Sequence, residues 1–407
     1  MKNWRRLGMK SEWTKKKLSD IADFNPRETI KKGSKAKKIP MDVLCPFYRD
    51  IPYYVEECFF GGTKFRNGDT IMARITPCLE NGKTAQVSIL NDGEVGFGST
   101  EYIVFRAKEG IADKDYLYYL VCSPEVREPA IKSMVGSSGR QRVQTDVVKN
   151  IVLGIPSLTE QERIGSFLKL IDDKIALNDR INENLEQQAQ ALYHLWFVNY
   201  EPFGGTRPAD WIDGSIDDLG SEIICGKTPS TKKTEYYGGS TPFITIPDMH
   251  GCVYTVSTER YLSVAGVTSQ SKKTIPRNSV CVSCIGTAGL VTLVSEESQT
   301  NQQINSIVPK EGVSAYYTYL LMQTLSETIN KLGQSGSTIV NLNKTQFGKI
   351  PVIVPPKNVS QKFDSLCSPL FEKVLSNQKE NIKLSDLRDT LLLKLMSGEI
   401  DISNIDF

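Results

Sequence analysis

Features of membrane and secreted proteins are missing from this sequence. No apolar run approaches the roughly 18 residues that a helix needs to cross a bilayer, and no apolar stretch follows the basic start as it would in a signal peptide. The nine cysteines show no regular spacing, which is typical of thiols in a reducing compartment rather than of a disulfide framework. We therefore expect a cytoplasmic protein with reduced cysteines.

A complete phosphate-binding loop is also missing. Gly82-Lys83-Thr84 and Gly226-Lys227-Thr228 each resemble the end of such a loop. However, Pro77 and Ser221 stand where the loop needs its first glycine. These segments fit basic loops that face DNA or solvent better than nucleotide sites.

Metal ligands are scarce. Cys281 and Cys284 have the spacing of half a zinc or redox site, but no second pair lies at a suitable distance in the sequence. The two histidines, His194 and His250, stand alone. We expect buried strand cysteines and no metal site.

Motifs of DNA-modifying and DNA-cleaving enzymes are incomplete. Asn25-Pro26-Arg27-Glu28 lacks the second proline and the aromatic residue of an amino-methyltransferase motif. Pro247-Asp248 is not followed by the Glu-x-Lys of a nuclease. We expect no catalytic site and no cofactor on this chain.

Charge is distributed unevenly along a chain whose formal net charge is only +2. Residues 1–150 carry 26 Lys and Arg against 19 Asp and Glu, whereas the remaining residues carry 23 against 28. The basic excess includes two clusters that could follow DNA phosphates, although a solvated surface explains either cluster equally well. They are Lys15, Lys16 and Lys17, and Lys31, Lys32, Lys35, Lys37 and Lys38.

The strongest signal is an internal repeat at an offset near 199 residues. In both halves a tryptophan near the start is followed by a Tyr-rich segment, a loop rich in Gly and Ser, and a strand that ends in proline. This shared order predicts two domains of one plan. The paired landmarks are Trp13 and Trp211, Tyr116–Leu120 and Tyr316–Leu320, Gly136–Gly139 and Gly333–Gly336, and Ile151–Pro156 and Ile350–Pro355.

Each half ends in a long amphipathic helix. Its core positions recur at alternating steps of four and three, the heptad pattern of a coiled coil, and the second helix repeats the first without a gap. Such a stripe is usually plain core, but here an asparagine pair is duplicated with it. The first seam is Ile164, Leu168, Ile171, Ile175, Asn178, Asn182, Leu185, Ala189, Leu192 and Trp196; the second is Phe363, Cys367, Leu370, Val374, Asn377, Asn381, Leu384, Arg388, Leu391 and Leu395.

Short apolar or alternating runs precede each helix. Examples are Thr70–Ile75 and Ser279–Ile285, which are separated from other runs by Gly and Pro and predict strands with long loops. The predicted fold class is α+β, with two tandem mixed α/β domains that are each followed by a long helix. The predicted bounds are 1–157 and 201–356 for the domains, and 158–200 and 357–407 for the helices.

The order globule, helix, globule, helix resembles the specificity subunits of type I restriction-modification systems. The likeness spans nearly the whole chain, and it depends on the order of the matching phrases more than on any one of them. These phrases are Ile155–Ile164, which leads into the first helix, Leu391–Ile400, which closes the second, and Gly98–Tyr102, Gly226–Pro229 and Thr300–Ile304 in the domains.

This resemblance implies two target recognition domains that read the halves of a bipartite DNA site, with the helices as spacer. It implies two methyltransferase subunits as partners, joined by motor-nuclease subunits in the full complex. It implies no contact with a membrane. S-adenosylmethionine, ATP and Mg²⁺ would then belong to those partners. One departure concerns the start, because Met9–Trp13 resembles a usual beginning more than Met1 does. Which methionine starts translation stays open.

Loops that mix basic, amide and hydroxyl groups with glycine are the candidate DNA contacts. Arg or Lys can bind guanine and Asn or Gln can bind adenine in the major groove. Arg74–Lys83 corresponds to Ile285–Gly289, and Gly136–Gln144 corresponds to Gly333–Asn341; ordinary polar turns are the alternative for each residue. The candidates are Arg74, Thr76, Lys83, Ser137, Ser138, Arg140, Gln141, Arg142, Lys227, Thr228, Thr287, Asn301, Gln302, Gln303, Ser335, Ser337 and Asn341.

The helices are expected to pair as an antiparallel coiled coil with pseudo-two-fold symmetry. Two similar domains present the same face to a two-fold DNA site only when an approximate dyad relates them. A dyad through the midpoints of the seams sets Asn178 against Asn381 and Asn182 against Asn377. Buried amides off register would lack partners, so we expect these four residues to select one alignment.

Two other classes of function stay open from the sequence. A non-catalytic coiled-coil scaffold that binds a ligand other than DNA would differ from a DNA reader by losing little affinity as salt rises. An independent nucleotide or thiol enzyme would need a complete site. The sequence does not predict the DNA target, the spacer length, the methylated bases or whether a restriction subunit exists.

Overall fold

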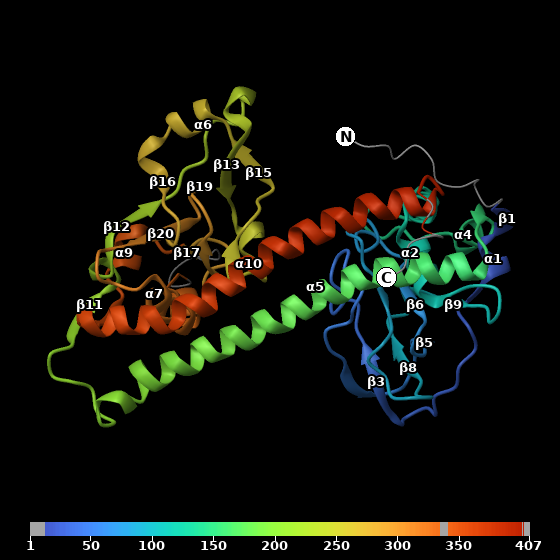
Figure 1. The fold of residues 1–407 in the computed structure, drawn as a ribbon, viewed down its shortest axis with the longest axis horizontal. Coiled ribbons are helices and arrows are strands. Elements are labelled where there is room, and N and C mark those ends of the chain that lie inside the picture. Colours follow the sequence, from blue (N-terminus) through green and yellow to red (C-terminus); the bar gives the residue numbers. More distant parts are fainter. Residues whose placement is uncertain (1–12, 334–340, 401, 403–407) are drawn as a thin grey trace. The chain divides into compact units, whose positions relative to one another are not determined.

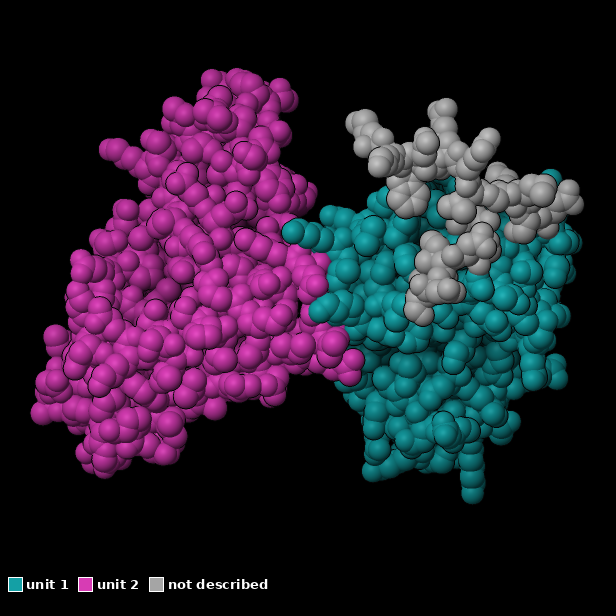
Figure 2. Space-filling model, viewed as in Figure 1, with its two compact units in different colours: residues 1–176, 383–407 teal, residues 177–382 magenta. Residues whose placement is uncertain are grey.

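Two compact units make up the computed structural model, which describes residues 13–333, 341–400 and 402. Unit 1 comprises residues 1–176 and 383–407, and unit 2 comprises residues 177–382 (Figure 2). Each unit therefore combines one mixed domain with a segment of both long helices. Met1 and Met9 lie outside the described residues.

Two four-stranded sheets and a two-stranded ribbon form the mixed domain of unit 1 (Figure 1). One sheet has the order β2-β9-β6-β7 and is antiparallel throughout. The other has the order β4-β3-β8-β5, with β3 and β8 parallel, and the ribbon pairs β1 with β10. The strands are β1 Thr14–Lys17, β2 Ala22–Phe24, β3 Lys35–Ile39, β4 Val55–Cys58, β5 Thr63–Phe65, β6 Thr70–Ala73, β7 Thr84–Gln86, β8 Gly96–Gly98, β9 Tyr102–Ala107 and β10 Val152–Ile155.

Unit 2 repeats this topology with one added strand. Its sheets have the orders β12-β20-β17-β18-β14 and β15-β13-β19-β16. The parallel pair β13 and β19 lies at the matching place, and the added strand β14 pairs in parallel with β18. The ribbon pairs β11 with β21. The strands are β11 Ile212–Ser215, β12 Gly220–Cys225, β13 Tyr237–Ile244, β14 Tyr254–Thr255, β15 Arg260–Leu262, β16 Thr274–Ile275, β17 Val280–Ser283, β18 Val291–Val294, β19 Ser298–Thr300, β20 Ile304–Pro309 and β21 Pro351–Val354.

Three short helices follow the two sheets in the same order in both units: α2, α3 and α4 in unit 1 match α7, α8 and α9 in unit 2. The Tyr-rich helices α2 and α7 are buried on nearly all sides, as an apolar helix in a core should be. Asp113 and Ser314 cap them by accepting hydrogen bonds from the N–H groups of Tyr116 (2.8 Å) and Tyr317 (3.3 Å). The short helices are α1 Leu18–Ile21, α2 Lys114–Cys122, α3 Pro124–Lys132, α4 Thr145–Lys149, α6 Val264–Thr268, α7 Ala315–Thr324, α8 Ser326–Gly333 and α9 Lys344–Gly348.

The two long helices run side by side in opposite directions in both units (Figure 1). Helix α5 spans Leu158–Tyr193 and α10 spans Lys357–Met396. Every predicted seam residue is buried or half-buried, which confirms the heptad pattern. Among the described residues, no helical segment has the length and apolar character that a bilayer crossing requires.

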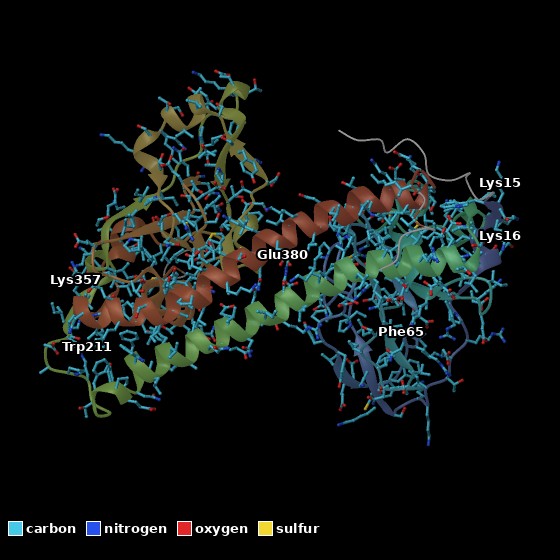
Figure 3. The ribbon with its side chains drawn as sticks, in the orientation of Figure 1. Lys15, Lys16, Phe65, Trp211, Lys357 and Glu380 are labelled. Carbon is cyan, nitrogen blue, oxygen red and sulfur yellow. The ribbon has the colours of Figure 1, made fainter. Side chains whose placement is uncertain are left out.

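Each end of the helix pair is part of a domain core rather than a free-standing coiled coil. In unit 1, Leu168 of α5 and Leu395 of α10 lie in one core with the residues of α2. In unit 2, Ala189 of α5 and Phe363 of α10 share the core that contains Trp211 (Figure 3). Burial of these side chains against the sheets holds each helix segment to its unit.

The four asparagines form the pairs that the antiparallel register predicts. Asn178 Nδ2 donates to Asn381 Oδ1 at 2.8 Å, and Asn377 Nδ2 donates to Asn182 Oδ1 at 2.8 Å. Asn178 also donates to Glu380, which Figure 3 shows on α10. Asn178 and Asn377 are fully buried, so these contacts pair amide groups that water cannot reach, while the buried Oδ1 of Asn377 stays without a hydrogen-bond partner.

A buried ion pair joins the same helices within unit 1. Arg388 Nη1 on α10 donates to Asp172 Oδ1 on α5 at 2.8 Å, and the Tyr119 hydroxyl of α2 donates to Asp172 Oδ2 at 2.6 Å. The side chains of Arg388 and Asp172 are only 10% and 6% exposed. The carboxylate raises the pKa of Arg388 despite the opposing effect of burial. The sequence pattern identified Arg388 as a seam residue but gave no sign of its partner.

Leucine at all four asparagine positions is expected to raise the melting temperature. The change removes buried amides, whose burial costs about 1–3 kcal/mol each when hydrogen bonding is imperfect, and adds apolar contact. Thermal unfolding followed by circular dichroism measures the effect. Asn184→Leu on the exposed face of α5 is the matched control and should leave the melting temperature nearly unchanged. A lower melting temperature in the four-leucine variant would show that the amides stabilise the pair.

Arg388→Ala is expected to destabilise the protein by about 3–5 kcal/mol, because it leaves the Asp172 carboxylate buried without its cation. The double variant Arg388→Met with Asp172→Leu should recover most of this loss. Urea unfolding of the full chain measures both. Lys383→Ala, on an exposed position of the same helix, is the control. Equal losses in the single and double variants would rule out the buried charge as the cause.

Candidate nucleic-acid interface

The two polar loops that the sequence singled out in the first half lie together in unit 1. A β-bridge joins Ile75 to Arg142, and Thr76 N donates to Gln141 O at 3.0 Å. Val143 N donates to Arg74 O at 2.9 Å. The loops 74–83 and 136–144 therefore form one surface, although more than fifty residues separate them in the chain.

Unit 2 holds its loops by the same contacts. Ile285 and Asn341 form the matching β-bridge, and Leu342 N donates to Cys284 O at 3.0 Å. Cys284 N in turn donates to Gln303 O at 2.8 Å. These backbone contacts establish structural equivalence at this surface between the two halves of the chain.

The equivalent bond in unit 1 runs from Arg74 N to Glu101 O at 2.9 Å. The contacts therefore match Arg74 with Cys284, Glu101 with Gln303 and Arg142 with Asn341. The last of these matches has the offset of 199 residues that was derived from the sequence.

About half of the predicted contacts project from this surface. In unit 1 the loop 136–144 is mostly exposed, and in unit 2 the exposed candidates are spread over four loops. Side chains of these types can donate to or accept from base edges and phosphates. The exposed candidates are Ser137, Ser138, Arg140, Arg142, Lys227, Thr287, Gln302 and Asn341; Gln141, Thr228 and Gln303 are half-buried. Ser335 and Ser337 lie outside the described residues.

Other candidates turn inward and hold the loops. Lys83 Nζ donates to the carbonyl of Met41 at 2.9 Å, and Thr76 Oγ1 contacts Glu80 at 3.4 Å. Asn301 is buried, and its Nδ2 donates to Gln303 Oε1 at 2.9 Å. The hydrogen bonds of these residues hold the loops in place from the protein side.

The loop that contains Lys227 is tied to the same surface in unit 2. Lys227 N donates to Thr300 O at 2.9 Å, and Thr228 Oγ1 donates to Gln302 Oε1 at 2.8 Å. A side chain at Gly226 would collide with the backbone of Asn301, so this close approach requires glycine. The loop of Lys227 is therefore bonded to the loop of Gln302, and Gln303 joins that loop to Cys284 beside the bridge at Asn341.

Glu101 belongs to this surface but was not among the candidates predicted from the sequence. Arg142 Nη2 donates to Glu101 Oε1 at 2.7 Å, and Arg142 Nε donates to Glu101 Oε2 at 2.9 Å. The hydrogen bond from Arg142, helped by the charges of Arg142 and Arg74, lowers the pKa of Glu101. Glu101 belongs to the phrase Gly98–Tyr102 that supported the family resemblance, but its place beside Arg142, 41 residues later in the chain, depends on the fold.

The two lysine clusters of unit 1 divide between ion pairs and open surface. Lys37 pairs with Glu94 at 3.0 Å and Lys38 with Glu57 at 2.8 Å, so both of these charges are neutralised locally. The exposed lysines suit electrostatic contact with phosphates. They are Lys31, Lys32 and Lys35, and on β1 Lys15 and Lys17, with Lys16 half-buried (Figure 3).

The cysteine pair that has the spacing of half a zinc or redox site lies in the protein core. Cys281 lies within β17 and Cys284 directly after it; both are buried, and burial raises the pKa of each thiol to about 12. This confirms the expectation of buried strand cysteines. Across the described part of the chain, no three His, Cys, Asp or Glu side chains are grouped so that they could hold a metal ion.

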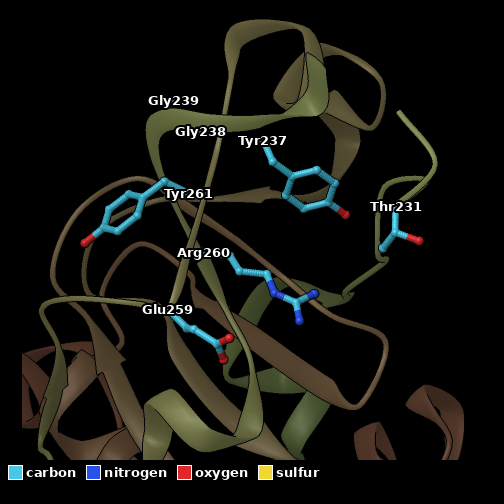
Figure 4. Close-up of a pocket in the computed structure, with 7 residues that line it drawn as sticks. All are labelled: Thr231, Tyr237, Gly238, Gly239, Glu259, Arg260 and Tyr261. Carbon is cyan, nitrogen blue, oxygen red and sulfur yellow. The ribbon is translucent and has the colours of Figure 1, made fainter. Parts of the chain in front are cut away.

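A recess lies beside β13 in unit 2. Two phenol rings, a carboxylate and a guanidinium border it, and five of its seven lining residues are exposed. Its lining residues are Thr231, Tyr237, Gly238, Gly239, Glu259, Arg260 and Tyr261 (Figure 4). None of the candidate contacts is among them, so the recess is separate from the loop surface.

Comparisons with known proteins agree with this architecture. The family model described as type I restriction modification DNA specificity domain matches residues 10–187 and again residues 208–385. The HindI specificity subunit of Haemophilus influenzae, a type I restriction enzyme subunit, is 34% identical over 82% of this chain and 87% of its own length. The MjaIX specificity subunit of Methanocaldococcus jannaschii is 25% identical over 73% of this chain and 71% of its own length.

A solved structure has the same fold. The S subunit of a type I restriction-modification system from M. genitalium is similar with a TM-score of 0.59, at 14% identity, over 96% of this chain and 97% of that one. The family model covers both halves of the repeat, including most of each long helix. The chain therefore belongs to the family of type I restriction-modification DNA specificity subunits, with one DNA specificity domain in each half.

Proposed function

We propose that this chain reads a bipartite DNA site, one half with each unit, and directs adenine methylation and cleavage by partner subunits. The duplicated loop surface carries this proposal. Both units hold two polar loops by the same β-bridge and the same backbone hydrogen bonds, at the same place in the same sheet order. A DNA site made of two half-sequences calls for two such reading surfaces on one chain.

The exposed side chains of the loops suit base reading. Arg142 can donate two parallel hydrogen bonds to guanine, and the amides of Gln302 and Asn341 can bind both adenine N6 and N7. Serine hydroxyls such as those of Ser137 and Ser138 suit phosphates or bases. Basic residues on β1 and before β3 add the salt-sensitive attraction to phosphates that would bring DNA to unit 1.

We infer that the helix pair sets the number of base pairs between the half-sites. Helices α5 and α10 each begin in one unit and end in the other. The buried pairs of Asn178 with Asn381 and Asn377 with Asn182 favour one register, which supports a fixed length rather than a sliding contact.

The chemistry is assigned to partners: two methyltransferase subunits, which would bind S-adenosylmethionine, and motor-nuclease subunits, which would use ATP and Mg²⁺. The incomplete methyltransferase and nuclease motifs of the sequence support that division of labour. A chromosomal DNA target would place the complex in the cytoplasm.

Deleting the gene is expected to abolish methylation at one adenine-containing sequence of two defined parts separated by a fixed spacer. Sequencing that detects methylated adenine in the host genome, with and without the gene, makes the measurement. Restoring the gene on a plasmid is the control. An unchanged methylation pattern, with the methyltransferase subunits present, would contradict the proposal and favour a scaffold that binds another ligand.

Exchanging residues 1–150 for those of a relative with a different target should change one half of the methylated sequence only. Each unit carries its own loop surface, so the other half and the spacer should persist. The same genome-wide map of methylated adenines reports the result, and exchange of residues 201–350 should change the opposite half. Changes in both halves, or in neither, from the first exchange would contradict independent reading.

A further inference from the structure

The loop surfaces of the two units share a backbone but carry different charges at equivalent positions. In unit 1 the pair is Glu101 and Arg142, whose side chains are joined by hydrogen bonds of 2.7 and 2.9 Å. In unit 2 the equivalent residues are Gln303 and Asn341, which carry neutral amides. The two units therefore offer different hydrogen-bonding groups at the same place.

The backbone of Arg142 makes more contacts than that of Arg140, the other exposed arginine of the loop. Its backbone forms β-bridges with both Ile75 and Val135, and its N–H and C=O exchange hydrogen bonds with Val135 at 2.9 and 3.0 Å. Arg140, two residues earlier, lies on a turn closed by a hydrogen bond to Ser137 O. A group that reads a base must be held within a fraction of an ångström, and Arg142 meets that condition.

Glu101 leaves the outer edge of the Arg142 guanidinium available. It accepts hydrogen bonds from Nε and Nη2. A guanidinium has five N–H donors, so both donors of Nη1 and one of Nη2 remain. The Arg142 side chain is 47% exposed, whereas that of Glu101 is 23% exposed. The remaining donors have the parallel arrangement that matches O6 and N7 of guanine.

We propose that Arg142 reads a guanine in the half-site bound by unit 1 and that Glu101 is the positioning residue that holds its guanidinium for this contact. The inference rests on the proposed function, and it adds the base and the residues that recognise it. The guanine would lie in the half-site read by unit 1. In the half-site read by unit 2, an amide would take the place of the guanidinium at the equivalent position.

A base contact explains the carboxylate better than a phosphate contact does. Glu101 neutralises the charge of Arg142 and would repel a phosphate brought within a few ångströms. The acceptors of guanine carry no net charge, so the hydrogen bonds to the base survive this neutralisation. The lowered pKa of Glu101 keeps the carboxylate ionised at neutral pH. Arg140, with no such partner, suits a phosphate.

The test uses the full chain assembled with its methyltransferase subunits. After the methylated site has been mapped, binding is measured on synthetic duplexes that carry the mapped site, with 7-deazaguanine placed at one guanine at a time to remove N7. One guanine of one half-site should be sensitive, with affinity lower by roughly ten- to a hundredfold. In Arg142→Ala this sensitivity should vanish, and affinity for the natural site should fall to the level of the modified one.

Variants of Glu101 separate positioning from simple support of the fold. Glu101→Ala should reduce the discrimination at that same guanine while leaving the other half-site and the melting temperature unchanged. Glu101→Gln, which keeps an acceptor oxygen, should retain part of it. Arg142→Lys should lose most of it, because lysine cannot make the bidentate contact.

Two controls fix the interpretation. Arg140→Ala should weaken binding to all duplexes alike and reduce the salt dependence by about one counterion. Asn341→Ala should alter discrimination only in the other half-site. Loss of affinity on every duplex in Arg142→Ala, with sensitivity to 7-deazaguanine intact, would overturn the inference in favour of a phosphate contact.

A tighter, equally selective complex in Glu101→Ala would overturn the positioning role. Failure of the proposed function gives a different result, because the deletion strain would then keep its methylation and no duplex would bind selectively.

Discussion

The buried amides at the centre of the helix pair are the constraint on which the rest of the structure depends. Asn178 and Asn377 are fully buried, so each must find a partner on the facing helix. Sliding one helix by a heptad would set an amide against an apolar side chain and leave it unsatisfied. In the antiparallel register, the beginning of each helix lies beside the end of the other. Each domain core is therefore completed by two segments that are far apart in the sequence.

Because the two domains are similar, a helix segment of one could pack in the core of the other. A difference between the two cores makes this exchange unfavourable. Unit 1 buries Asp172 against Arg388. The equivalent positions in unit 2, at the repeat offset, are Phe371 and Ala189, and Phe371 stacks on Tyr316 with ring centroids 4.6 Å apart. An exchanged segment would bury the Arg388 charge in an apolar core, at a cost of several kcal/mol. The ion pair thus distinguishes two interfaces that share one backbone plan.

The sequence was sufficient for the fold class and the helix register because both depend on periodic patterns. It was insufficient for the loop surface, whose contacts depend on which strands become neighbours. Glu101 and Arg142 lie 41 residues apart and meet only through the pairing around Ile75. Composition also cannot separate inward from outward side chains in a polar loop. Lys83 and Asn301 have the right chemistry for DNA, yet their polar groups bond within the protein.

The loop surface is built so that its chemistry can change while its shape persists. The bridges at Arg142 and Asn341 use backbone N–H and C=O groups, which any residue except proline supplies. A glutamate and an arginine in one unit and two amides in the other therefore fit the same backbone. Seam positions have no such freedom, because their side chains are the core itself. Under the proposed function, a new base preference would arise at the loops with little cost in stability, whereas a change in spacing would require rebuilding the helix pair.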